Sequence, residues 1–290
     1  MTSWRELEVA HQERADALSA THRARRLRGE THPVEDFLWT YYSFTPSELR
    51  RWHPGAGFAL EEAPERAEWR YYRVDARGSA RVDLAAFFAK RGGTVDYVER
   101  LLAATLERTP QFGCFGLHEW AMVYRLAPEQ LRHTRLPLRV GAEATDAVVE
   151  AHPVSCSHFD AYRFFTPEAA PLNRLAPTRE NQPDLEQSAC LHAGMDIYKW
   201  ATKLVPIVPG ELVLDAFELA RDIRVVDMRA SPYDVSGFAG DDGAPLEPVA
   251  IETPEGKREY VRLQRGFAER GNALRLRVLD AIADARALAG

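Results

Sequence analysis

Two ionisable side chains, His192 and Asp196, interrupt a segment that otherwise has the composition of a buried helix. The segment runs A-C-L-H-A-G-M-D-I-Y-K-W and carries no other charge before Lys199. Side chains at positions i and i+4 share one helix face, so this pair could bind one metal ion or one substrate. A hydrogen bond between the two side chains inside the core would explain the spacing equally. The pattern indicates a polar site in a helical core.

The next helical segment carries acidic residues in two kinds of position. Its sequence is E-L-V-L-D-A-F-E-L-A-R-D-I-R-V-V-D-M-R, and Asp227 falls inside the apolar arc of the helix. A stripe along one edge of that arc contains Glu211, Asp215, Glu218 and Asp222. The stripe is typical of a solvated helix flank. Asp227 could pair with Arg224 or Arg229. The alternative makes Asp222 or Asp227 a metal ligand or a general base.

The segment S-C-S-H-F-D-A-Y alternates in character, and residues 157–165 are expected to be extended. On a strand, Cys156, His158, Asp160 and Tyr162 would point to the same side. His-x-Asp on a strand recurs in metal centres with two histidines and one carboxylate, because alternate residues present two ligands to one point. A histidine with a purely structural role would fit the same pattern.

Two further segments could supply a site. His118 and Glu119 follow a Gly-x-x-Gly turn, where the start of a helix favours a neutral imidazole or an anion. The absence of H-E-x-x-H excludes the zincin class of metalloprotease. The loop at 171–182 is rich in Arg, Asn and Gln, and it could bind a carboxylate or phosphate or be a solvated connection.

Composition favours a soluble cytoplasmic protein. The chain has 290 residues, a net charge of −6, a pI of about 5.9 and three cysteines that form no CxxC pair. The acidic balance argues against a dedicated binder of nucleic acid or anionic membranes, and the cysteine count excludes a standard structural zinc knot. No apolar run reaches membrane-spanning length, and the N-terminus lacks the apolar core of a signal peptide.

The periodicity predicts one mainly α-helical domain with a minor β element. An amphipathic helix at 3–29 precedes a core at about 31–232, and a final helix follows at about 253–288. The β element is expected as a hairpin around 57–75. Further helices are expected at about 81–90, 94–108, 142–151, 184–204 and 210–229.

Several blocks spread along the chain have a distinctive composition. They are H-P-V-E-D-F-L-W-T-Y-Y, F-G-C-F-G-L-H-E-W-A-M-V-Y, S-H-F-D-A-Y-R-F-F, C-L-H-A-G-M-D-I-Y-K-W and D-I-R-V-V-D-M-R-A-S-P-Y-D. Together they resemble a family of actinobacterial proteins commonly labelled "3-methyladenine DNA glycosylase", over residues 31 to 286.

This resemblance implies a helix-hairpin-helix motif followed by a catalytic carboxylate. Residues 136–141 (L-P-L-R-V-G) stand at the hairpin, with Leu138 in place of its first glycine, and Asp160 follows at nearly the required distance. Asp160 would then stabilise a cationic sugar, and the hairpin amides would bind a DNA phosphate at a helix N-terminus. The basic residues near Asp160 would be Arg132, Arg135 and Arg139.

We expect from the residues a metal-dependent enzyme, hydrolytic or O₂-dependent, that acts on a small polar molecule. The predicted ligands of its Fe, Mn or Zn ion are His158, His192 and Asp196. The predicted catalytic residues are Asp160, His118 and Asp222. The predicted substrate-binding residues are Arg174, Arg179 and Asn181. The alternatives are a DNA glycosylase that uses Asp160, and a non-catalytic binding protein whose buried ionisable groups pair with arginines.

Overall fold

The computed structural model describes residues 3–131, 133, 135–240 and 243–290. It confirms the expected mainly α-helical class, because helices dominate and strands form one small sheet. Within these residues no helix combines the length and apolarity needed to cross a membrane.

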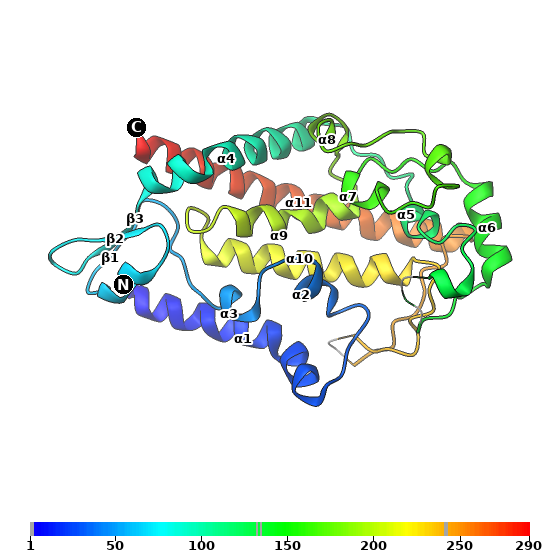
Figure 1. Cartoon of the computed structure of the whole chain (residues 1–290), viewed down its shortest axis with the longest axis horizontal. Helices are drawn as coiled ribbons and strands as arrows, with labels where there is room; N and C mark the ends of the chain where they lie inside the picture. The colour runs from blue at the N-terminus through cyan, green and yellow to red at the C-terminus, as the bar shows by residue number, and fades with distance from the viewer. Residues whose placement is uncertain (1–2, 132, 134, 241–242) are drawn as a thin grey trace.

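Three long helices run side by side through the centre of the molecule (Figure 1). These are α9 (Leu191–Lys203), α10 (Gly210–Arg229) and α11 (Pro254–Ala289). A short connection after α9 makes α9 and α10 an antiparallel pair, and α4 (Leu84–Glu107) packs along α11. The buried faces of α9 and α10 are almost entirely apolar, so burial of these faces is the main force that aligns the helices.

The N-terminal helix α1 (Trp4–Arg28) covers α10 from the other side (Figure 1). Ser3 forms a capping box with Glu6, which satisfies amide groups that the first turn leaves free. Arg14 of α1 binds the carboxylates of Asp215 and Glu218, each at 2.8 Å. Two members of the acidic stripe of α10, Asp215 and Glu218, are therefore partly solvated and pair with α1.

The sheet lies at one end of the molecule (Figure 1), with strand order β1-β3-β2. Its strands are β1 (Ala59–Leu60), β2 (Tyr72–Val74) and β3 (Ala80–Val82), and the 3₁₀ helix η1 (Pro64–Glu68) joins β1 to β2. The expected hairpin within 57–75 is wrong, because β1 and β2 each pair with β3. The tight turn lies between β2 and β3, where Asp75 accepts hydrogen bonds from two backbone amides of the turn.

One expected break in helical structure is absent, and one expected helix is interrupted. The predicted helix at 184–204 is interrupted, because α8 (Gln182–Leu185) ends before α9 begins at Leu191. The predicted helices at 81–90 and 94–108 form the single helix α4, which continues through Gly92 and Gly93 because the turn after them is buried at Val95 and Val98.

The remaining helices are α2 (Phe37–Tyr41), α3 (Pro46–Leu49), α5 (Leu117–Ala121), α6 (Ala142–Ala151), α7 (Phe159–Tyr162), α8 (Gln182–Leu185), η2 (Pro128–Gln130) and η3 (Ala170–Leu172).

The expected extended segment at 157–165 is wrong. His158 is the N-terminal cap of α7, and Asp160 lies inside this helix. Alternation of aromatic and polar residues over so few positions does not separate a strand from one helical turn. His158 and Asp160 therefore do not share a strand face.

Candidate metal centre

The antiparallel pairing of α9 and α10 places the start of one helix beside the end of the other. His192 lies in the first turn of α9, and Asp227 lies near the end of α10. The short helix α5 packs at the same end of the bundle (Figure 1) and adds His118 and Glu119. Each of these four side chains offers one ligand atom, and the four atoms lie within 4.8 Å of one another. We call these four residues the His118 cluster.

Charged hydrogen bonds organise the His118 cluster. His118 Nε2 lies 2.8 Å from Asp227 Oδ1, and Arg224 Nη1 lies 3.1 Å from Asp227 Oδ2. The same Arg224 atom is 3.5 Å from Glu119 Oε1. The Asp227 side chain is fully buried, so a bare carboxylate would be very costly there. Of the two arginine partners that the sequence suggested for Asp227, Arg224 makes the contact.

His192 differs from the other members because one of its ring nitrogens is buried without a partner. Nδ1 has no hydrogen bond to any described residue. The His192 ring packs edge-on against His118 at 4.4 Å and stacks on His158 at 5.3 Å between ring centroids. A buried polar atom without a partner costs about 1–3 kcal/mol. A ligand that accepts the nitrogen lone pair would remove that cost.

The protonation states of the two histidines are opposite. Burial alone would lower the pKa of His118, but the carboxylate of Asp227 stabilises the imidazolium and raises this pKa well above its usual value. Burial lowers the pKa of His192 well below its usual value, and the charge of His118 acts in the same direction. His192 is therefore neutral, which is the form that binds a metal ion. A metal ion would also have to displace the proton that His118 shares with Asp227.

The chemistry of the four donors fits a divalent metal ion. Two imidazole nitrogens and two carboxylate oxygens suit Fe(II), Mn(II) or Zn(II). Burial, together with the charge of Asp227, raises the pKa of Glu119, so this carboxyl group can hold a proton more readily than an ordinary glutamate. Arg224 contacts Glu119 and Asp227, and it would orient these two carboxylates without binding the metal ion itself.

A second buried cluster adjoins the first across the stacked rings of His192 and His158. His158 Nε2 lies 3.4 Å from Asp196 Oδ2 and 3.6 Å from Glu186 Oε2. The ammonium group of Lys199 contacts Asp196 Oδ2 at 2.8 Å and Asp160 Oδ2 at 2.7 Å. The sequence predicted a metal ion beside Asp196, and in the structure the ammonium group of Lys199 provides the positive charge there. The structure brings His192 together with His118, Glu119 and Asp227, and places His158 and Asp196 beside this ammonium group.

A small cavity reaches the His118 cluster from one side. It has a volume of about 120 Å³, and Glu119, His192 and Arg224 line it together with aromatic side chains. A wider cleft of about 690 Å³ shares Tyr41 and Asp160 with this cavity. A small molecule in the cleft could therefore place one end next to His192.

The cleft is rich in basic and aromatic side chains. Its basic residues are Arg163, Arg179, Lys199 and Lys203, and its aromatic residues are Tyr41, Tyr42, Tyr97 and Trp200. Asp160 is the acidic residue among those that line the cleft, and it binds Lys199 and Arg179. The net positive charge of the cleft contrasts with the net charge of −6 of the whole chain.

The other predicted residues lie in different surroundings. Arg179 lines the cleft, as a substrate-binding residue would. Asn181 ties its own loop together by bonds to Thr178 and Ala176, and Arg174 is exposed on the same loop. Asp222 lies on the outer side of α10, where it binds Arg270 at 2.8 Å, and it does not join the His118 cluster. This last placement removes the basis for a catalytic role of Asp222.

The predicted ligand set omitted Glu119 and Asp227. The sequence did contain a signal for Asp227, because an acid inside an apolar helix face must find a partner. Glu119 follows the Gly-x-x-Gly turn that the sequence also singled out, but it lies in a helix of five residues whose packing depends on distant segments, so its neighbours could not be predicted.

Residues of the helix-hairpin-helix motif that the resemblance implied take other roles in the structure. Arg139 forms a two-pronged ion pair with Glu252, at 2.7 and 2.8 Å, and its guanidinium lies over Trp120. Gly141 precedes α6, and Asp160 lies in the following helix. Arg132 lies outside the described residues.

Comparisons with known proteins return nothing. No family model matches the chain, and neither a curated protein nor a solved structure does. Only the geometry of the site indicates a function.

Proposed function

We propose that the protein is a metal-dependent enzyme whose metal ion is held by the His118 cluster. One observation carries the proposal: the neutral His192, whose buried Nδ1 has no partner, offers a ring nitrogen within 4.8 Å of ligand atoms from His118, Glu119 and Asp227. The adjoining cavity supports it, since a catalytic ion needs an open side.

The metal ion would act as a Lewis acid and orient the reacting group. His118, His192 and Asp227 are the proposed ligands. Glu119 would either be a fourth ligand of the metal ion or transfer a proton at the edge of the cavity. The raised pKa of Glu119 favours the second role, because a carboxyl group that titrates nearer neutral pH is a better acid–base catalyst. Arg224 holds Asp227 and Glu119 in place for either role.

The substrate class follows from the cleft beside the cavity. Arg163, Arg179 and Lys203 would attract an anionic molecule, and Tyr97 and Trp200 would contact its apolar part. The narrow cavity admits only a small reacting group next to His192. We therefore propose a small anionic substrate. Zinc or manganese in the centre would favour hydrolysis, and iron would favour an O₂-dependent oxidation.

The metal content of untagged protein, purified without chelator and measured by mass spectrometry, tests the proposal. We expect near-stoichiometric Fe, Mn or Zn in the wild type. His192→Leu and Asp227→Asn should each lose the metal. Asp196→Asn is the matched control, because it removes a buried carboxylate that belongs to the neighbouring cluster and binds Lys199.

The outcomes separate the two possible ligand sets. Loss of metal in Asp196→Asn with retention in His192→Leu and Asp227→Asn would move the metal to the neighbouring cluster and refute the assignment. Folded wild-type protein that stays metal-free after incubation with each of the three ions would refute the metal-dependent enzyme altogether.

A further inference from the structure

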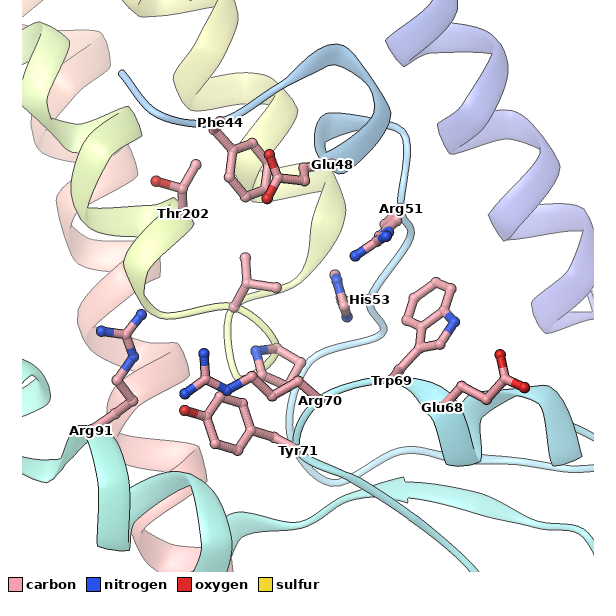
Figure 2. Close-up of a pocket in the computed structure, with 12 residues that line it drawn as sticks. Phe44, Glu48, Arg51, His53, Glu68, Trp69, Arg70, Tyr71, Arg91 and Thr202 are labelled. Carbon is pink, nitrogen blue, oxygen red and sulfur yellow. The ribbon is translucent and has the colours of Figure 1, made fainter. Parts of the chain in front are cut away.

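Another cavity lies at the other end of α9 from the His118 cluster. It has a volume of about 460 Å³. Thr202 lines it near the end of α9, ten residues from His192, and helical rise puts about 15 Å between these positions. Figure 2 shows that α4, α9, the α3 region and the segment before β2 all contribute side chains to it. This cavity is therefore separate from the proposed metal centre.

Three arginines, Arg51, Arg70 and Arg91, converge on this cavity from three different segments. Among the described residues none of the three forms an ion pair; Arg51 and Arg70 are exposed, and Arg91 is half-buried. Unpaired arginines that line a cavity of this size leave guanidinium N–H groups available to a ligand.

The walls of the cavity are aromatic. The guanidinium group of Arg70 lies 4.6 Å from the ring centroid of Tyr71, and that of Arg51 lies 6.0 Å from that of Trp69. Figure 2 shows Phe44 on the opposite side of the cavity. Flat apolar walls and guanidinium groups together suit a ligand with a planar ring and an anionic group.

Two polar atoms of this cavity are buried without a partner. They are the hydroxyl oxygen of Tyr71 and Nε of Arg91, and neither bonds to a described residue. Tyr71 also has a φ of 64°, a left-handed conformation that is unusual for an aromatic residue. Its ring packs edge-on against Phe87 at 5.2 Å. Backbone strain and unsatisfied polar atoms at the same place are typical of ligand-binding positions.

The acidic residues of the cavity do not neutralise these arginines. Both the amide and the hydroxyl of Thr45 bind Glu48 Oε2, at 2.8 and 2.7 Å, so this carboxylate caps α3. Glu68 is exposed, and Figure 2 shows its carboxylate pointing away from Arg70 and Arg91. Burial lowers the pKa of His53 to about 3, so its ring adds no charge. Three arginines against two glutamates leave the lining of the cavity with a net positive charge.

We propose that this cavity binds an aromatic molecule that carries a phosphate group, such as a nucleoside monophosphate. A phosphate dianion matches more than one guanidinium fork, and Arg is the residue that binds phosphate through paired N–H groups. The aromatic walls take the planar ring, and the volume lies in the range of small-molecule sites. The proposal does not depend on the metal-dependent activity.

Isothermal titration of the full-length protein with AMP tests the proposal. We expect binding that weakens at least ~10-fold in Arg70→Gln and in Arg91→Gln, the loss that corresponds to about 1.4 kcal/mol. Tyr71→Phe, which removes only the unpartnered hydroxyl, should weaken binding less. Adenosine and inorganic phosphate, each offering half of the ligand, should bind more weakly than AMP.

Two matched variants show whether the effect is local. Arg73→Gln removes an exposed arginine of the same segment that does not line the cavity and should bind AMP as the wild type does. Arg179→Gln tests the cleft beside the metal centre. Binding that depends on Arg179 and not on Arg70 would place the ligand in that cleft and overturn the proposal. Absence of binding for both AMP and phenyl phosphate at millimolar concentration would also overturn it.

Discussion

Replacing His192 by leucine should make the metal-free protein more stable. Nδ1 of His192 is buried without a hydrogen bond, and the low pKa of the ring means that no charge interaction is lost. Removing an unsatisfied polar atom recovers about 1–3 kcal/mol. Leucine also has a higher helix propensity by a few tenths of a kcal/mol. The neighbouring cavity leaves room for the different shape of the leucine side chain.

Allowing for imperfect repacking, we expect the free energy of unfolding of the metal-free protein to rise by about 1 kcal/mol. For a chain of this length, this corresponds to a melting temperature higher by about 2 °C. The response to metal should be opposite. At a free metal concentration of a hundred times Kd, the wild type should gain about 2.7 kcal/mol, and His192→Leu should gain almost nothing.

Urea unfolding and thermal melts of chelator-treated protein, with and without added metal, measure both effects. His22→Leu is the control, because His22 Nδ1 binds Asp36 at 2.8 Å away from the cluster. This variant should lose about 1–3 kcal/mol and keep the full response to metal. Metal-free His192→Leu that is less stable than the wild type would refute the reasoning, since His192 would then make a stabilising interaction in the absence of metal.

Two further predictions concern other parts of the fold. Gly256→Ala should lower the free energy of unfolding by about 3 kcal/mol, because the added Cβ would lie 2.0 Å from the backbone oxygen of Ala250. Gly266→Ala is the control in the same helix, because no atom lies within 4 Å of the added Cβ, and it should be neutral or stabilising. Urea unfolding measures both variants, and equal effects of the two changes would contradict the prediction. His53 has a pKa of about 3 in the folded protein, against an ordinary value of 6.5. Between pH 3 and pH 6.5 the unfolded chain therefore binds more protons than the folded protein, and the free energy of unfolding falls as the pH falls. Between pH 7 and pH 5 the wild type should lose about 2 kcal/mol more than His53→Gln, and parallel pH profiles of the two proteins would show that His53 does not remain neutral on burial.

Local signals in the sequence defined much of the helical framework. In the structure Ser3 and Thr45 form capping boxes, and Pro254 stands at the first position of α11, so residues next to each helix start account for where it begins. The apolar periodicity of α10 gave its limits at 210–229. These features depend on backbone hydrogen bonds and neighbouring side chains a few residues apart, so a single sequence contains them.

Other elements depended on contacts between distant segments. Residues 157–165 alternate like a strand, but His158 instead caps a single helical turn. β1 and β2 pair with β3 and not with each other. Gly92 and Gly93 do not break α4, because packing of the following turn outweighs their weak helix propensity. In each case the local preference was small compared with the free energy of burial.

The sequence by itself determined that the core contains histidines and carboxylates that need partners, since Asp227 and His192 interrupt apolar helix faces. The tertiary structure decided which groups meet. The antiparallel pairing of α9 and α10 brings His192 to Asp227, α5 adds His118 and Glu119, and Lys199 occupies the neighbouring acids. Ligand atoms from three helices converge only when the helices pack, and packing depends on the shape of the whole core.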